Sequence, residues 1–290
     1  MIQIENVSKS YDDFLAVDDV SITVEKGTVH GLIGENGSGK TTLIKCMTGI
    51  YKADKGEIRM AGEPVFENPE VKQKIGYVAD YNQYFPTYRV DQMIRFYQDM
   101  YPKFEEDAFY DYNKVFHLDV DKRIAQLSKG QKMRLAIMLN LAMRPEILIL
   151  DEPTSGLDAI AKKEVLDLIV SEVEERNLTV FISSHHLAEL EKICDTVSII
   201  HNGKIKYQDD IDEIKTKIRK LQVVFPEGMP AGFMKNYNVI DCSNSGSIYQ
   251  VVLPSVNDAA VARMKEDGAV LVEEIPITLE EMFIYTNKEE

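Results

Sequence analysis

Apolar residues along the first 210 residues of this chain follow two patterns, one typical of strands and one typical of helices. Short runs in which every residue or every second residue is apolar predict strands at 2–4, 20–24, 29–33, 74–79, 147–150 and 179–183. Apolar residues three and four positions apart predict helices at 41–48 and 160–176. The unbroken run at 147–150 is typical of a strand buried on both faces, so we expect an α/β core around a parallel sheet.

The stretch 81–116 is rich in aromatic residues and holds 12 of the chain's 25 Phe and Tyr residues. Apolar residues at 93–100 have helical spacing, which Pro102 interrupts. These features predict a helical subdomain at about 85–142. The aromatic side chains either fill the core of this subdomain or form an exposed docking surface, and their exposure decides between the two.

A second set of elements is expected after residue 210. The pattern predicts a connecting helix at 211–220, strands at 221–225, 247–253 and 270–275, and a helix at 257–266. The chain therefore divides into a larger domain at 1–210 and a small C-terminal α+β domain at 221–290.

Acidic residues dominate the charge of the chain, since 48 Asp and Glu against 33 Lys and Arg give a formal net charge of −15. Proteins that bind nucleic acids concentrate Lys and Arg, so this balance excludes a duplex-binding protein. Cys46, Cys194 and Cys242 are far apart and odd in number, which is typical of a reducing compartment. The chain has no run of about 18 apolar residues and no signal peptide, so we expect a cytoplasmic protein that does not itself enter a membrane.

Residues 34–41, GENGSGKT, lie between a predicted strand and a predicted helix. They fit the pattern G-x-x-x-x-G-K-[ST], in which backbone N–H groups and a helix N-terminus surround a phosphate. We expect Lys40 to reach the β- and γ-phosphates of a nucleotide and Thr41 to hold Mg²⁺.

Asp151 and Glu152 end the buried strand predicted at 147–150. Ligands of open α/β sheets bind at the carboxyl ends of the strands. Asp151 suits the Mg²⁺ shell, and Glu152 suits polarising the water that attacks a phosphate. Alone, such a pair is usually a solvated strand end, but together with Lys40 it predicts a nucleotide-hydrolysing site.

Four further positions resemble motifs of the ATP-binding-cassette (ABC) ATPases. Residues 127–131, LSKGQ, are similar to the family's signature peptide, and residues 155–158, SGLD, to its D-loop. Tyr11 stands where an aromatic residue stacks on adenine, and His185 where the switch histidine contacts the γ-phosphate. The resemblance covers 2–207 and implies a P-loop NTPase core with a RecA-like parallel sheet, an antiparallel β subdomain and a helical signature subdomain.

The resemblance also implies how these motifs work together with ATP and Mg²⁺. Ser128 is a good N-cap, so the signature peptide forms a helix N-terminus that needs a phosphate from elsewhere. In the family that phosphate belongs to ATP on a second ATPase subunit, identical or paralogous, and two chains close head to tail around two ATP molecules. The residues assigned to ATP are Tyr11, Gly34, Asn36, Gly37, Ser38, Gly39, Lys40, Thr41, Thr42, Ser128, Gly130, Gln131 and Asp158. Those assigned to catalysis are Glu152 and His185, and those assigned to the metal are Thr41, Asp80 and Asp151.

Two positions depart from the family pattern. The family usually has glutamine after the strand at 75–79, where it links Mg²⁺ to the helical subdomain, but here Asp80 follows that strand. A carboxylate still suits a metal shell but cannot donate a hydrogen bond, and Gln83 is the alternative residue for this role. Lys129 places a cation in the first turn of the signature helix, where it opposes the helix dipole unless a phosphate is near.

An ABC ATPase without a membrane span implies a motor subunit, held at the inner face of the cell membrane by a separate permease. Residues 277–283, ITLEEMF, are similar to the C-terminal helix of ATPases that serve drug and antibiotic exporters, which favours export. The alternative is a soluble ABC-type ATPase that acts as a regulatory or interaction switch. Ribosome-acting members have two cassettes in one chain and chromosome-type members have long coiled-coil insertions, and neither fits one phosphate loop followed closely by the signature peptide.

Overall fold

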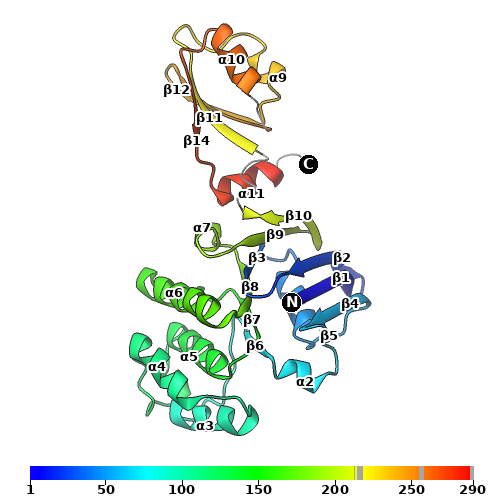
Figure 1. Ribbon diagram of the computed structural model, residues 1–290, viewed down its shortest axis with the longest axis vertical. Coiled ribbons are helices and arrows are strands. Elements are labelled where there is room, and N and C mark those ends of the chain that lie inside the picture. Colours follow the sequence, from blue (N-terminus) through cyan, green and yellow to red (C-terminus); the bar gives the residue numbers. More distant parts are fainter. Residues whose placement is uncertain (212, 214–217, 255–257, 288–290) are drawn as a thin grey trace. The chain divides into compact units, whose positions relative to one another are not determined.

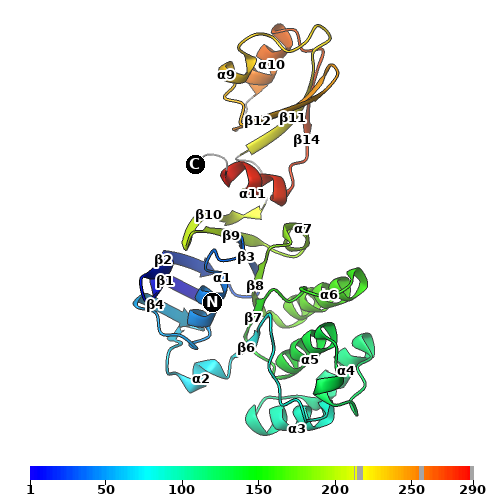
Figure 2. The same cartoon turned by 180° about the vertical axis from the view of Figure 1, so that it is seen from behind.

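The computed structural model describes residues 1–211, 213, 218–254 and 258–287. They form two compact units (Figures 1 and 2), of which unit 1 is Met1–His186 with Ile193–Gln208, and unit 2 is Leu187–Lys192 with Asp209–Glu290. The connecting helix expected at 211–220 is only partly described, because 212 and 214–217 lie outside the described residues. The expectation is wrong for 218–220, since these residues pair with a neighbouring strand as the start of β11 (Ile218–Val224).

A six-stranded sheet forms the centre of unit 1 and has the strand order β10-β9-β3-β8-β7-β6. Its strands are β3 (Val29–Ile33), β6 (Ile75–Val78), β7 (Ile147–Asp151), β8 (Thr179–Ser184), β9 (Thr196–His201) and β10 (Lys204–Asp210). The strands from β9 to β6 pair in parallel, and every residue of β3, β7 and β8 is buried. Because these strands are covered on both faces, their sequences are unbroken apolar runs. Their carboxyl ends meet at one edge of the sheet.

A four-stranded sheet with the order β2-β1-β4-β5 forms the antiparallel β subdomain. Its strands are β1 (Ile2–Tyr11), β2 (Phe14–Val24), β4 (Lys55–Met60) and β5 (Glu63–Pro64). Alternate residues such as Ile2, Ile4 and Ile22 are buried in one core with Leu43 and Met47 of helix α1 (Lys40–Met47). This shared core holds the turn between β1 and β2 near the start of α1.

Three helices group together at one end of unit 1 (Figure 1): α3 (Val90–Met100), α4 (Glu106–Phe116) and α5 (Lys129–Ala142), with a short 3₁₀ helix η1 (Ile124–Gln126) before α5. The aromatic residues of 81–116 divide here into buried and exposed side chains. Phe109, Tyr112 and Phe116 are buried in the core of this group, whereas Tyr81 and Phe85 are exposed.

The remaining helices of the chain's first part are α2 (Pro69–Lys72), α6 (Ala159–Arg176) and α7 (Leu187–Leu190). Helix α6 begins where Asp158 accepts hydrogen bonds from two backbone N–H groups and ends at Asn177, whose φ is +52°. The apolar residues Leu187, Leu190 and Cys194 have the spacing of a longer helix, but α7 ends after one turn at Leu190.

Unit 2 contains an antiparallel sheet with the order β12-β13-β11-β14. Its elements are β11 (Ile218–Val224), α9 (Phe233–Asn236), β12 (Asp241–Ser245), β13 (Ile248–Pro254), α10 (Asp258–Glu266), β14 (Leu271–Ile275) and α11 (Leu279–Asn287). Its separate core includes Val223, Phe225, Phe233, Val251 and Met264. The sequence pattern missed β12, because DCSNS is polar and its last three residues are exposed.

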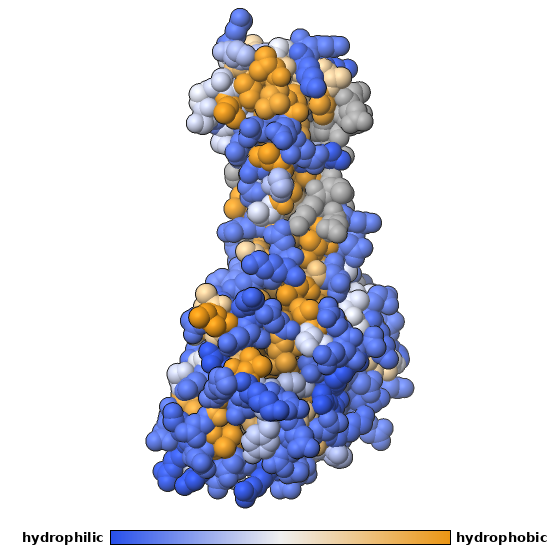
Figure 3. All heavy atoms as spheres, turned by 60° about the vertical axis from the view of Figure 1, so that its left-hand side comes forward, coloured by the Kyte–Doolittle hydropathy of each residue, from blue (hydrophilic) through white to orange (hydrophobic). Residues whose placement is uncertain are grey.

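The observed layers confirm the expected fold class, an α/β core with an antiparallel β subdomain and a helical subdomain. The face in Figure 3 is mostly hydrophilic, with hydrophobic residues gathered in separate patches. None of the helices in the described residues has the length and apolarity that a bilayer crossing requires.

Candidate functional site

The phosphate loop runs from β3 to α1 and contains two glycines in tight surroundings. Gly39 is the N-cap of α1 with φ +108°, and a Cβ there would lie 2.4 Å from the carbonyl oxygen of Ala16. A Cβ at Gly34 would lie 2.5 Å from the carbonyl oxygen of Ile200. This close packing fixes the loop at the N-terminus of α1, where the helix dipole and backbone N–H groups favour a phosphate.

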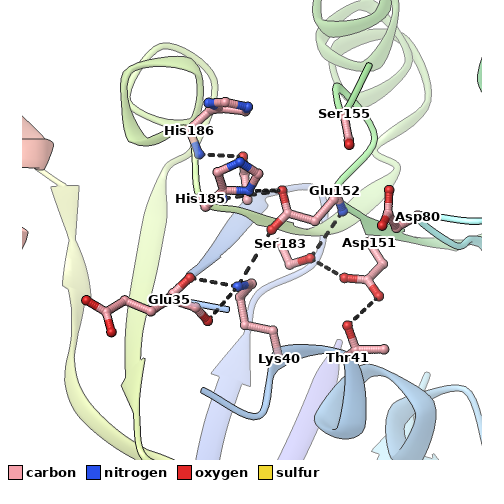
Figure 4. A network of polar contacts seen from close by, with 12 residues as sticks. Glu35, Lys40, Thr41, Asp80, Asp151, Glu152, Ser155, Ser183, His185 and His186 are labelled. Carbon is pink, nitrogen blue, oxygen red and sulfur yellow. Dashed lines mark hydrogen bonds and ion pairs between the residues drawn. The ribbon is translucent and has the colours of Figure 1, made fainter. Parts of the chain in front are cut away.

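Lys40 is the first residue of α1, and its side chain folds back across the loop (Figure 4). Its Nζ atom donates to the carbonyl oxygens of Gly34 at 2.6 Å and Glu35 at 3.1 Å. The same Nζ lies 3.6 Å from Oε1 of Glu152, and only 6% of the Lys40 side chain is exposed. The ammonium is therefore held inside the loop, where an anionic phosphate can pair with it.

Asp151 ends β7 and links the phosphate loop to the neighbouring strand (Figure 4). Its Oδ2 accepts a 2.9 Å hydrogen bond from the hydroxyl of Thr41, and its Oδ1 accepts a 2.6 Å bond from the hydroxyl of Ser183. Asp151 and Ser183 are register partners in β7 and β8, so the sheet itself brings them together. Sequence reasoning missed Ser183, although its place at the carboxyl end of a buried strand was a usable signal.

Glu152 lies directly after β7 with φ +52°, in the left-handed region. Its Oε2 is 2.7 Å from Nδ1 of His185 and accepts a 3.3 Å hydrogen bond from the backbone N–H of His185. Its Oε1 is buried and has no hydrogen-bond partner among the described residues. One oxygen of the carboxylate is thus fixed by the histidine, while the other faces Lys40 and has capacity to accept a proton.

A pocket of about 280 Å³ opens over this cluster. It is lined by Tyr11, Phe14, Ala16, Glu35, Asn36, Gly37, Gly39, Lys40, Thr41, Thr42, Asp80 and Glu152. The hydroxyl of Tyr11 donates to Oγ1 of Thr42 at 3.4 Å, and its ring packs edge-on against Tyr51. The sequence predicted most of this lining, but it gave no signal for Phe14 or Ala16, which only the turn between β1 and β2 brings to the loop.

The signature peptide forms the N-terminus of α5 and does not line this pocket. The hydroxyl of Ser128 accepts a 3.2 Å hydrogen bond from the N–H of Gln131, whose side chain accepts a 3.0 Å bond from the N–H of Ser128. This reciprocal capping box explains why α5 starts here. Asp158 likewise caps α6, and the N–H groups of Ala161 and Ile160 lower its pKa.

Asp80 follows β6 at the margin of the pocket and is paired with the signature peptide. Its Oδ1 lies 3.1 Å from Nζ of Lys129, which also donates to the hydroxyl of Ser155 at 3.1 Å. Gln83 lines a different groove, in the helical subdomain. Of the two residues proposed to replace the family's glutamine, only Asp80 therefore lies among the described residues that line the phosphate pocket.

The oxygen atoms of Thr41 and Asp151 suit a magnesium ion. Mg²⁺ prefers oxygen ligands and usually keeps several waters and phosphate oxygens, so one or two protein carboxylates suffice. Asp151 is buried, yet the described residues offer it hydroxyl hydrogen bonds and no ammonium or guanidinium partner. The described part of the chain contains no group of three or more His, Cys, Asp or Glu side chains that could hold a metal ion.

The sequence matches the family model for ABC transporters over residues 17–155. The ABC transporter ATP-binding protein YtrB of Bacillus subtilis (strain 168) is 33% identical over 284 residues, which are 98% of this chain and 97% of that protein. The chain belongs to the ABC transporter ATP-binding proteins. This ABC ATPase is also 35% identical to the bacitracin transport ATP-binding protein BcrA of Bacillus licheniformis, over 76% of this chain and 73% of that protein.

A solved structure shows the same fold. The ATP-binding cassette MJ0796, a dimer in a post-hydrolysis state bound to ADP and Pi, matches with a TM-score of 0.66 and 21% identity, over 73% of this chain and 99% of that one. The resemblance drawn from the motifs is therefore confirmed at the level of family and fold. The ABC ATPase described here is an ATP-binding, ATP-hydrolysing subunit of a transporter.

Proposed function

We propose that this ABC ATPase closes head to tail with a second ATPase subunit around two ATP molecules and thereby drives export through a separate membrane permease. One observation carries the proposal. Among the described residues that line the phosphate pocket there is none from the signature peptide, although Ser128 caps a helix N-terminus of the kind that binds anions. A companion chain's triphosphate supplies the missing partner for this helix.

The residues around the phosphate loop support a hydrolytic role in this closed state. Lys40 stabilises the negative charge that develops on the phosphoryl group, because its ammonium is already held in the loop. Water attacks the γ-phosphorus, the bond to the β–γ bridging oxygen breaks, and the proton of the water passes to Glu152. His185 orients the Glu152 carboxylate through Oε2.

Thr41 and Asp151 would hold Mg²⁺, together with Asp80, which also lines the pocket. Bound Mg²⁺ neutralises charge on the triphosphate. Ser183 positions Asp151 by donating its hydroxyl hydrogen to Oδ1. The adenine stacks on Tyr11, a residue that lines the pocket and is 40% exposed.

The helical subdomain offers a groove for the permease. The groove has a volume of about 470 Å³ and is lined by Gln83, Tyr84, Phe85, Met93, Phe96, Tyr97, Met100 and Tyr101. Phe85 packs against Tyr88 and Phe96 with centroid separations of 4.9 and 5.7 Å, yet remains 49% exposed. Exposed aromatic side chains beside a groove are typical of a protein-binding surface.

Relatives support the direction of transport. BcrA is a bacitracin transport ATP-binding protein, and a further relative, SrtF of Streptococcus pyogenes, is a lantibiotic transport ATP-binding protein. We infer that this subunit serves an exporter and is held at the inner face of the cell membrane by its permease.

The experiment is copurification of the tagged full chain from detergent-solubilised membranes. We expect one polytopic membrane protein to accompany the parent chain and to be lost from the variants Tyr84→Ala and Phe85→Ala. Tyr110→Ala is the matched control, because Tyr110 is exposed on α4 but does not line the groove. Recovery of a soluble partner in place of a membrane protein would contradict the transport role.

A further inference from the structure

Asp80 and Lys129, the two residues at which this chain departs from the family motifs, contact each other directly. They lie 49 positions apart in the sequence, and their charged atoms are 3.1 Å apart. Asp80 lines the phosphate pocket, and it also lines a second, smaller pocket with Lys129 and Lys132. The pair therefore joins the edge of the nucleotide site to the first residue of the signature helix.

We propose that this ion pair reports nucleotide binding to the signature helix. In the structure, Lys129 is held by Asp80 and Ser155 of its own chain. When Mg²⁺-ATP enters the pocket, the Asp80 carboxylate turns to the metal, and Lys129 is released to contact the triphosphate that the companion chain holds. This proposal rests on the head-to-tail dimer proposed above.

The strength of the pair suits an exchangeable contact. The side chains of Asp80 and Lys129 are each 50% exposed. Exposed ion pairs contribute little to stability, and they are screened further by salt. A divalent metal with a triphosphate offers the Asp80 carboxylate a much stronger partner than one solvated ammonium does.

The position of Lys129 suits its second role. Lys129 is the first residue of α5, and the first turn of this helix contains no acidic residue. Its ammonium lies near the positive end of the helix dipole, and the half-exposed carboxylate of Asp80 offsets this conflict only weakly. A companion's triphosphate removes this conflict, so the charge that costs stability in the open chain favours the closed dimer.

Ser155 extends the contact to the D-loop. Its hydroxyl accepts a hydrogen bond from the same Nζ of Lys129. Release of Lys129 therefore frees the D-loop and the signature helix in one event. In the proposed dimer, both segments lie on the surface of this chain that contacts the companion chain.

The test is a double-mutant cycle on ATP-induced dimer formation. The full chain carries Glu152→Gln throughout, and light scattering measures the concentration of Mg²⁺-ATP that gives half-maximal dimer for the parent, Asp80→Asn, Lys129→Met and the double variant. Each single variant removes the ion pair of the open chain, and this loss by itself favours the dimer. The double variant removes the same ion pair, so it gains this effect only once. We therefore expect the double variant to need about two- to fivefold more Mg²⁺-ATP for half-maximal dimer than the product of the two single effects predicts. Direct losses at the metal or at the companion's phosphate cancel in the cycle.

A single-residue comparison tests the second role of Lys129. We expect Lys129→Met to require about tenfold more Mg²⁺-ATP than the parent for half-maximal dimer, because it loses a charge-assisted contact to phosphate. Lys132→Met is the matched control, since Lys132 lines the same small pocket on α5 without forming the ion pair, and its effect should stay within about twofold.

Three outcomes are decisive. Multiplicative effects in the cycle show that dimer formation breaks no stabilising contact between Asp80 and Lys129, and they overturn the exchange. Equal effects of Lys129→Met and Lys132→Met overturn the contact with the companion's triphosphate. If the Glu152→Gln parent forms no dimer with Mg²⁺-ATP, the proposed function itself fails, and this inference fails with it.

Discussion

The Nδ1 atom of His185 lies 2.7 Å from Oε2 of Glu152, and this contact divides the work of the carboxylate between its two oxygens. Oε2 is held by the histidine ring and by the backbone N–H of the same residue. Oε1 is buried without a hydrogen-bond partner in the described structure, 3.6 Å from Nζ of Lys40. The residue proposed as general base is thus held in one orientation by two contacts from His185.

Glu152→Gln should separate ATP binding from hydrolysis. The amide keeps the shape of the side chain but cannot take up the proton of the attacking water, so hydrolysis should fall by about 10²- to 10⁴-fold. The phosphate loop and the signature helix stay intact, and a long-lived closed dimer should accumulate in Mg²⁺-ATP. Size-exclusion chromatography measures the dimer, and hydrolysis at the parent rate would reject Glu152 as the base.

Lys40→Ala should instead prevent nucleotide binding. It removes the ammonium that the carbonyl oxygens of Gly34 and Glu35 hold in the loop. Loss of a charge-assisted contact to phosphate should weaken ATP binding by about 10- to 100-fold and abolish the dimer. Equilibrium dialysis with ATP checks this, and the exposed Lys26→Ala serves as the control. Equal ATP affinity in both variants would exclude Lys40 from the site.

His30 should make the fold sensitive to mild acid. It is buried between Thr196 and Ser198, whose hydroxyls lie 2.6 and 2.9 Å from its ring nitrogens, and burial lowers its pKa from 6.5 to about 3. The depressed pKa means that only the unfolded chain takes up a proton between these two values. Stability from the neutral ring is therefore complete above pH 6.5 and is lost as the pH falls toward 3.

His30→Gln should reduce this sensitivity. At pH 5 the wild-type chain loses about 2 kcal/mol of unfolding free energy through His30, relative to pH 7, and the variant should not show this loss. Urea unfolding at both pH values measures the difference. His117→Asn is the control, because His117 is exposed and adopts a left-handed conformation that Asn tolerates. An unchanged pH dependence in His30→Gln would assign the effect to other groups.

Sequence and structure agree best where burial dictates the pattern. The runs at β3, β7 and β8 are fully buried, so they were recognisable as strands of a parallel sheet. The full extent of β2 was not recognisable from the sequence, because exposed and half-buried residues such as Asp18 and Asp19 interrupt its apolar alternation. Tertiary pairing with β1 supplies what the local pattern lacks.

The candidate site shows the same contrast between features set by the local sequence and features set by the tertiary fold. Lys40, Asp151 and Glu152 were recognisable because their motifs depend on local strand, loop and helix context. The ion pair between Asp80 and Lys129 was not recognisable from the sequence, because this contact depends on how the fold brings the end of β6 close to the start of α5. No spacing rule in the sequence encodes a contact of that kind, so it emerged only from the coordinates.

Glu172 should anchor the helical subdomain to α6. This carboxylate is 5% exposed, accepts a 2.7 Å hydrogen bond from the hydroxyl of Tyr112 on α4, and pairs with Arg176. Glu172→Ala leaves a partly buried guanidinium without its counter-charge and should cost about 3 to 5 kcal/mol of unfolding free energy. The exposed Glu174→Ala should change stability by less than about 0.5 kcal/mol. Urea unfolding compares the two, and equal stability would show that the Glu172 cluster adds nothing.

The dependence of ATPase activity on protein concentration tests the central claim most directly. If each hydrolytic centre combines the phosphate loop of one chain with the signature helix of another, the rate per molecule must fall on dilution as the dimer dissociates. We predict an initial rate that rises with the square of the protein concentration at low concentration and becomes proportional to it at high concentration. A constant rate per molecule at every dilution, from protein that light scattering shows to be monomeric, would contradict the account.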